Sequence, residues 1–374
     1  MTASERKMVK RIPRERTNRE LLPASVGPAR TAVLLLALLG TSIPGCMFFR
    51  GKGSSPSKLP EARTAGLDSE GSRADGEERA PRSPFEYTPS LVGKPYEDLR
   101  RHTVHALGAI AGIDVSPDGA ALLYSSTQDG AAANIYIKRE NSPGVTRKTS
   151  GRSWDIHPRF SPDGKWIAFA SDRDGNFDIW IIPAGAAGGA EQFTSSPEDD
   201  LSPTWSPDGR KIALCRRSPD HGWTLWILDR SDQSVVELGP GLLPAWSPTG
   251  EWIAFQKPSE REPHWFGLWI IRPDGSEVRQ VVAGDGFGAM APSWSPEGHS
   301  IAFSAVRQGT GDIRQVVRGD VWVTKLSSGK MYRITSGPGT EATPVWGLGG
   351  RIYFASDRRD GAGIWSLLPP EVEG

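Results

Sequence analysis

The sequence predicts an all-β protein, and three observations carry this prediction. The 374 residues include 43 Gly, 31 Pro and 14 Trp; Gly and Pro mark tight turns, and Trp packs well on half-buried strands. A short motif recurs six times, and its spacing in the forties is typical of propeller blades. We therefore expect a six-bladed β-propeller of four-stranded antiparallel blades, preceded by a signal segment and a disordered tether.

The motif centres on a Ser-Pro-Asp-Gly turn. Its copies read IDVSPDGAALLYSS, PRFSPDGKWIAFAS, PTWSPDGRKIALCR, PAWSPTGEWIAFQK, PSWSPEGHSIAFSA and PVWGLGGRIYFAS. The position after Ser is held in turn by Pro117, Pro162, Pro207, Pro248, Pro296 and Leu348, with spacings of 45, 45, 41, 48 and 52 residues. Each copy predicts a strand before the turn, an Ile-Ala-Phe strand after it and an Ile-Trp strand beyond a polar loop. Outer strands are expected to end near Thr149, Thr194, Val282 and Thr335.

Tryptophan follows the same period. The first-strand position holds Phe160, Trp205, Trp246, Trp294 and Trp346. The third-strand position holds Tyr136, Trp180, Trp226, Trp269, Trp322 and Trp365. Rings locked to the repeat are expected to fill the layer between adjacent sheets rather than to stack on bases.

The sixth copy lacks an outer strand of its own. Only residues 366–374 follow Trp365, and Pro369 and Pro370 cannot donate hydrogen bonds to a sheet. Counting back from Pro117 by the spacing of the other blades reaches Thr103. We therefore predict that a strand near Leu99 to Thr103 pairs with residues 364–367 and closes the ring, since an open blade would expose a free edge.

Residues 1–45 have the order of a secretory signal, basic and then apolar, ending at Gly45-Cys46. The apolar run from Ala32 to Leu39 covers about 12 Å as a helix, too short for a hydrocarbon core of about 30 Å. Its end resembles a bacterial lipobox, which implies lipidation of Cys46. The alternative is a signal that is simply cleaved, with Cys46 incidental.

Residues 46–95 are rich in Gly, Ser, Pro and charge, with few apolar side chains to bury. Such a segment cannot offset its ordering entropy, so we expect a disordered tether that precedes the propeller of residues 96–374. The formal charge of the whole chain is zero, which argues against a nucleic-acid partner, since binding phosphates requires a basic excess. A monomer is expected.

The residues WSPDGxxIAFxSxRxG followed by IW resemble the TolB-type propeller repeat, a WD-like repeat, over about residues 100 to 368. The resemblance implies a periplasmic, non-enzymatic scaffold that binds envelope proteins or peptide segments. Together with a lipid anchor, the resemblance implies that the protein is located on the periplasmic side of the outer membrane. TolB proteins carry an α/β domain where this sequence has its tether. The same repeat occurs in peptidases and polysaccharide lyases, so a lyase-type enzyme with metal or base groups at the channel mouth is the alternative.

Acidic residues recur three positions before a Pro at the start of three first strands. These are Asp155, Asp200 and Glu341. They either meet at the channel mouth, where they would bind a divalent cation or a basic segment, or they cap backbone N–H groups and face water. Asp172, Arg173, Asp357 and Arg358 recur in register and are expected to fix loops.

Loop residues that depart from the repeat are the better candidates for partner binding. They are His157, His221, Trp223, His264, Trp265 and Arg307. No Gly-x-Ser-x-Gly or His-Glu-x-x-His motif occurs, so we expect no catalytic residue, metal ligand or resident cofactor. Cys215 replaces an Ala of the previous copy and is expected in the core.

Overall fold

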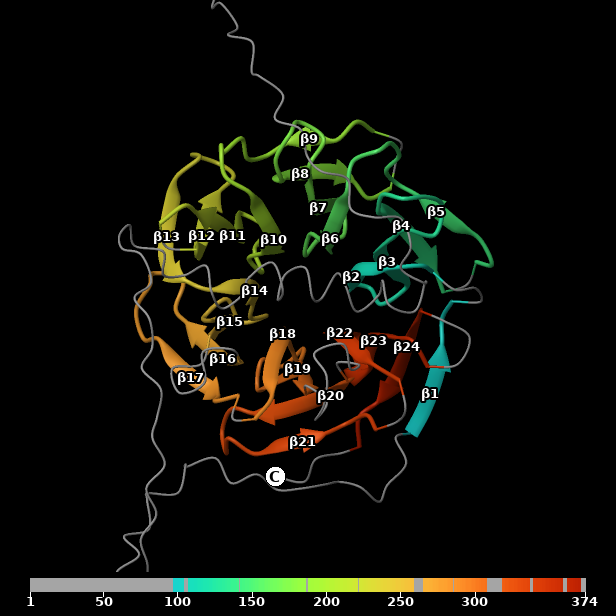
Figure 1. Ribbon diagram of the computed structural model, residues 1–374, viewed down its shortest axis with the longest axis vertical. Coiled ribbons are helices and arrows are strands. Elements are labelled where there is room, and N and C mark those ends of the chain that lie inside the picture. Colours follow the sequence, from blue (N-terminus) through green and yellow to red (C-terminus); the bar gives the residue numbers. More distant parts are fainter. Residues whose placement is uncertain are drawn as a thin grey trace, which may run out of the picture.

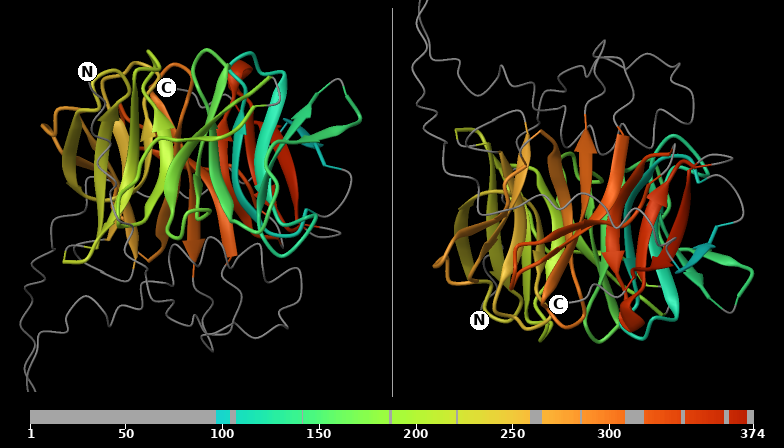
Figure 2. Two further views of the ribbon diagram at one scale, coloured as in Figure 1. Left: turned by 90° about the horizontal axis from the view of Figure 1, so that it is seen from above. Right: turned by 90° about the horizontal axis from the view of Figure 1, so that it is seen from below.

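The chain folds as six four-stranded antiparallel sheets around a central channel (Figure 1). The computed structural model describes residues 97–103, 107–140, 142–185, 188–220, 222–258, 265–284, 286–307, 318–336, 339–358 and 362–370. Figure 2 shows the blades side on, forming a short cylinder. The predicted all-β propeller is confirmed. Within the described residues, no helix is long and apolar enough to cross a membrane; the predicted signal segment, Cys46 and the tether lie outside them.

Blades 1 to 5 run outward from the channel in chain order, and blade 6 takes its outer strand from the start of the propeller. Blade 1 consists of β2 (Ile110–Val115), β3 (Ala121–Ser126), β4 (Asn134–Arg139) and β5 (Val145–Arg147). Blade 2 consists of β6 (Asp155–Phe160), β7 (Trp166–Ser171), β8 (Asp178–Pro183) and β9 (Glu191–Gln192). Blade 3 consists of β10 (Asp200–Trp205), β11 (Lys211–Ser218), β12 (Gly222–Asp229) and β13 (Val235–Pro240). Blades 4 and 5 consist of β14 (Leu242–Trp246), β15 (Ile253–Pro258), β16 (Phe266–Ile271) and β17 (Arg279–Val282), and of β18 (Gly288–Trp294), β19 (Ser300–Arg307), β20 (Arg318–Lys325) and β21 (Met331–Arg333). Blade 6 combines β22 (Glu341–Trp346), β23 (Ile352–Ser356) and β24 (Gly363–Leu368) with β1 (Glu97–Arg101).

The Ser-Pro-Asp-Gly motif forms a turn that its own side chains hold. In blade 2, Ser161 Oγ donates to Asp163 Oδ1 at 2.6 Å and accepts the N–H of Trp166 at 3.0 Å. Asp163 Oδ1 also accepts the N–H of Lys165 at 3.1 Å. Gly164 has a φ of 69°, which costs glycine little. The motif therefore joins the first and second strands at the same height in successive blades.

The predicted closure of the ring is confirmed. Strand β1 pairs antiparallel with β24, with Arg101 opposite Trp365. Thr103 Oγ1 accepts the N–H of Ile364 at 3.1 Å. The same bond recurs in blade 1, where Thr149 Oγ1 accepts from Ile135 N at 3.0 Å. The segment before the first blade therefore serves as the outer strand of the last.

The tryptophans of the repeat lie between sheets, as predicted. Trp205, Trp294, Trp322 and Trp365 are buried, and the half-buried Trp246 packs against the core cluster that contains Trp205. The indole N–H of Trp294 donates across the blade interface to Ala245 O at 2.8 Å. The sulfur atom of Cys215 lies in the core, so that prediction is confirmed as well.

Candidate functional site

The central channel has two parts, which we call the throat and the funnel. The throat is a cavity of about 50 Å³ ringed by Gly112, His157, Ser202, Leu243, Ala291 and Thr343. The funnel is a cavity of about 390 Å³ at the end where the first strands reach their turns. Its wall includes Asp114, Arg159, Trp205, Trp246, Trp294 and Trp346. The throat has room for a few water molecules only, whereas the funnel has the size of a ligand site.

A repeated backbone distortion builds the throat. The six residues of its ring each lie five positions before the turn position, and all have positive φ, from 48° at Leu243 to 136° at Gly112. The pairing of the first and second strands shifts register beside each of them, as it does between Ile156 and Arg159. A non-glycine residue held there costs about 1–3 kcal/mol. Such bulges redirect side chains, and here they constrict the channel.

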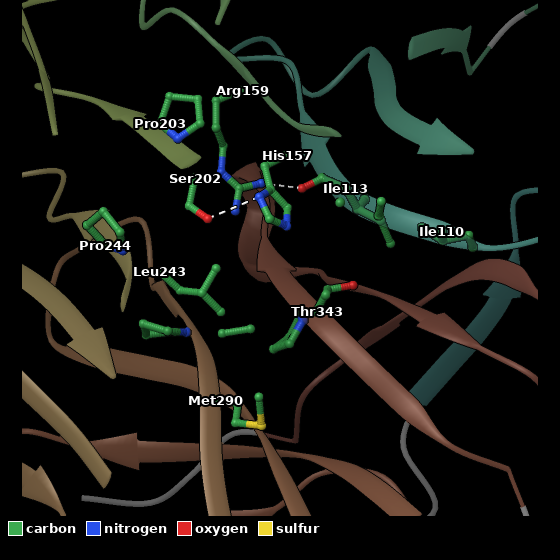
Figure 3. A pocket seen from close by; sticks show the side chains of 15 residues that line it. Ile110, Ile113, His157, Arg159, Ser202, Pro203, Leu243, Pro244, Met290 and Thr343 are labelled. Atoms are coloured by element: carbon green, nitrogen blue, oxygen red, sulfur yellow. Dashed lines mark hydrogen bonds between the residues drawn. The ribbon is translucent and has the colours of Figure 1, made fainter. Parts of the chain in front are cut away.

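His157 is the titratable member of the throat ring. Its Nδ1 lies 3.0 Å from Ser202 Oγ, and Figure 3 shows both side chains beside the cavity. Burial lowers the pKa of His157 to about 3, and the positive charge of Arg159 contributes. A ring that resists protonation is poorly suited to accept a proton from the serine hydroxyl. The contact joins β6 of blade 2 to β10 of blade 3.

The three predicted acids do not open onto the channel. Asp155, Asp200 and Glu341 have no exposed surface. Each carboxylate pairs with an arginine of its own blade, and the shortest N–O distances are 3.1 Å to Arg173, 2.7 Å to Arg216 and 2.6 Å to Arg358. These acids are thus paired with arginines inside the blades, although Asp155 Oδ2 is buried without a hydrogen-bond partner, and the expected cluster at the channel mouth is absent among them.

The arginines of these pairs also cover aromatic rings. The guanidinium carbon of Arg173 lies 4.7 Å from the ring of Trp180, and that of Arg216 lies 5.0 Å from Trp226. Such cation–π contacts add stability where the ion pair is shielded from water. Arg173 therefore fixes its loop as predicted, but its partner is Asp155 and not the neighbouring Asp172. Asp172 instead accepts the N–H of Trp154 at 2.8 Å.

Other predicted site residues lie away from the funnel. Trp223 is the second residue of β12 and Trp265 precedes β16, at the end of the propeller opposite the turns, and both are half-buried. Arg307 ends β19 and is exposed. The predicted residues His221 and His264 lie outside the described residues. Partner binding by this group stays a prediction.

Sequence reasoning missed the polar side chains three positions before the turn. Asp114 Oδ2 accepts the N–H of Phe160 in the next blade at 2.7 Å. Ser293 Oγ accepts the N–H of Trp346 at 3.0 Å in the same way. Arg159 holds this position in blade 2. The sequence shows this position as a variable one, polar in four of the six copies, beside the repeating aromatic residue. Its place in the channel follows only from the arrangement of the strands in a ring.

Metal chemistry at the channel has no support from side-chain clustering. Among the described residues, no three His, Cys, Asp or Glu side chains gather in a way that could hold a metal ion. The lyase alternative called for His157 to lie among acids at the channel, but Asp155 and Asp200 are engaged by arginines inside their blades. A divalent cation at the channel mouth stays an untested prediction.

Comparison with known proteins supports the architecture. Residues 96–239 match the family model for the TolB beta propeller domain. Over these residues, which are less than half of the chain, the described propeller resembles the TolB beta propeller domain. Among curated proteins, no sequence matches the chain.

Solved structures of the TolB-like fold include proteins of different activities. A protein designated TolB from Agrobacterium tumefaciens is 23% identical with a TM-score of 0.51, over 60% of this chain and 79% of its own. TolB from Acinetobacter baumannii is 18% identical with a TM-score of 0.49, over 70% of this chain and 63% of its own, so the chain spans less than two thirds of it. Oligogalacturonate lyase from Vibrio parahaemolyticus is 12% identical with a TM-score of 0.50, over 74% of this chain and 93% of its own. At these identities the likeness shows the fold alone.

Acidification is expected to destabilise this propeller through its partly buried histidines His157 and His102. Burial lowers the pKa of His157 to about 3 and that of His102 to about 4, below the ordinary 6.5. The unfolded chain therefore binds protons first as pH falls. Their contribution is complete above about pH 6.5 and is lost as pH falls toward 4, by about 1.4 kcal/mol per pH unit for each histidine. Urea unfolding at pH 7 and pH 5 should show a shallower pH dependence in His157→Gln and His102→Gln; equal slopes would contradict this account.

Proposed function

We propose that this TolB-like propeller is a non-enzymatic scaffold that receives a peptide segment of an envelope protein in its funnel. The supporting observation is the shape and chemistry of the channel. The funnel is wide at the turns and ends at the narrow throat, so it suits insertion of a segment rather than passage through the ring. Among the described residues that line it, two side chains, Asp114 and Arg159, are charged.

The funnel wall offers the surface that peptides bind well. Trp246 and Trp346, which are half-buried, line the cavity together with Trp205 and Trp294, which are largely buried between the sheets, and the four come from different blades. Aromatic anchors at a desolvated centre dominate the energetics of protein interfaces. TolB proteins, which share the fold, resemble this chain in the repeat, and this likeness supports a protein partner rather than a nucleic acid.

Blocking the funnel tests the proposal. Leu348 lies at its rim and is 57% exposed, so a bulky maleimide on Leu348→Cys should obstruct entry. The same reagent on Val236→Cys, 45% exposed on the outer strand β13, is the matched control. Buried Cys215 should not react in the folded protein. We expect the first conjugate to lose capture of envelope proteins and the second to retain it. Equal capture by both would refute funnel binding.

We also propose that the chain is anchored to the outer membrane through a lipid on Cys46. The supporting observations are the apolar run and the Gly45-Cys46 junction in the sequence. Cys46→Ser should shift the protein from the membrane fraction to the soluble fraction of lysed cells, because the variant carries no lipid and therefore has no apolar anchor in the membrane. Unchanged sedimentation, with no incorporation of labelled fatty acid in the unmodified protein, would contradict the anchor.

A further inference from the structure

Arg159 is the arginine of the channel that has no carboxylate partner among the described residues. It lies in β6, and its side chain borders both the throat and the funnel. Its Nη1 donates to the backbone oxygen of Ile113, as the dashed line in Figure 3 shows. A guanidinium carries five N–H donors. The described ion pairs of Arg173, Arg216 and Arg358 satisfy those arginines inside their blades, but none of the described ion pairs includes Arg159.

Asp114 is the acid beside Arg159, yet its carboxylate is directed elsewhere. Asp114 Oδ2 accepts the N–H of Phe160 across the interface between blades 1 and 2. Burial raises the pKa of Asp114, and the charge of Arg159 opposes that rise only in part. The carboxylate is therefore a weak competitor for the guanidinium. The positive charge of Arg159 remains available to a ligand.

The rest of the funnel is neutral. The positions equivalent to Arg159 in blades 3 to 6 are Thr204, Ala245, Ser293 and Val345. A guanidinium that forms no ion pair with Asp114, in a cavity whose other described lining side chains are neutral, is stabilised by a ligand that brings one negative charge. A carboxylate matches the planar fork of arginine with two parallel hydrogen bonds, which are stronger in a site shielded from water.

We propose that Arg159 binds a carboxylate of the segment that enters the funnel, so that the partner is recognised through an acidic side chain or a free carboxyl terminus. This inference rests on the proposed function and names the chemistry of its ligand. Apolar and aromatic walls hold the neighbouring residues of the segment, and Arg159 selects its charge.

Three acetylated tripeptides test the inference and separate the two sources of carboxylate. Acetyl-Ala-Ala-Ala with a free carboxyl terminus is compared with its amide and with acetyl-Ala-Asp-Ala-amide. The tryptophans of the funnel wall provide a fluorescence signal for the titrations, and calorimetry provides an independent one. We expect at least one carboxylate peptide to bind more tightly than the neutral amide by a factor of about ten or more. A hydrogen bond between charged groups contributes enough free energy to change the affinity by about this factor. The tighter of the two identifies the source.

Variants assign the effect to Arg159. Arg159→Gln should remove the preference for carboxylate while leaving the affinity of the amide unchanged. Asp114→Asn keeps an acceptor for Phe160 N–H and removes the nearby negative charge, so it should strengthen carboxylate binding. Arg217→Gln is the matched control, because it makes the same substitution at an arginine that lies outside the funnel with a 66% exposed side chain. It should leave the affinities of all three peptides unchanged. Thermal unfolding of each variant checks that it is folded.

The outcomes separate this inference from the proposed function. If the peptides bind but the carboxylates hold no advantage, or if Arg159→Gln and Asp114→Asn leave the preference intact, the inference is overturned and funnel binding stands. If none of the peptides binds and the blocked Leu348→Cys conjugate still captures its partners, both fail.

Discussion

Deleting residues 96–104 is expected to abolish cooperative folding of the propeller or to cause aggregation. The deletion removes β1, which pairs with β24 and whose following residue, His102, donates its backbone N–H to Ile364 O at 2.9 Å. It also removes the ion pair between Asp98 and Arg351 and the contact between His102 and Ser366. Each hydrogen bond contributes about 1 kcal/mol, so the loss is comparable with the whole stability of a domain, about 5–15 kcal/mol.

A deletion of residues 51–85 is the matched control, because the sequence assigns them to the tether. Thermal unfolding and size-exclusion chromatography measure both proteins. The protein that lacks residues 96–104 should unfold at a much lower temperature or elute as aggregates, since the exposed edge of β24 pairs readily with other chains. The tether deletion should behave as the full chain does. Equal tolerance of the two deletions would show that β1 is dispensable for closure.

Removing the arginine of one buried ion pair is expected to cost about 3–5 kcal/mol of unfolding free energy. Arg358→Gln leaves the carboxylate of Glu341, which has no exposed surface, without its cation. Burial already raises the pKa of Glu341, and the hydrogen bonds from Arg358 oppose that rise. Without Arg358 the side chain must be buried as an unpaired charge or take up a proton. Urea unfolding at pH 7 measures the loss.

The double variant Glu341→Gln/Arg358→Gln should recover much of that loss, because no charge then remains buried. Arg147→Gln removes an exposed pair in which the atoms of Arg147 and Asp129 lie 3.8 Å apart, and it should cost less than about 1 kcal/mol. If Arg358→Gln were as mild as Arg147→Gln, the buried pair would have no structural role, and the acid would again be a candidate for binding a partner.

Periodicity made the architecture of this protein predictable. The spacing of the turns set the number of blades, and the position of Thr103 relative to Pro117 placed the closing strand correctly. Both depend on local patterns, because hydrophobic alternation and turn residues act over a few positions. The tryptophans of the repeat were assigned to the core for the same reason.

The chemistry of the channel was not predictable from one sequence. Asp155 and Arg173 are 18 residues apart, and only the pairing of β6 with β7 brings them together. The acids were therefore expected either at the channel mouth or as loop residues that cap backbone N–H groups and face water, although they lie inside the blades. Arg159 was overlooked, because its position points into the channel only after the bulge beside His157 has turned the strand. Such placements arise from contacts between elements, which a linear pattern does not contain.

Site-specific photo-crosslinking in intact cells tests the central claim most directly. A photoreactive amino acid at Leu348, on the rim of the funnel, reports a segment that enters there. The same group at Trp265 reports binding at the opposite end of the channel, and at Val236 it reports contact with the outer edge. The funnel proposal predicts a discrete crosslinked protein from position 348 that is absent from positions 265 and 236. Crosslinks from position 265 with none from position 348 would contradict it and would assign binding to the face that bears Trp223 and Trp265.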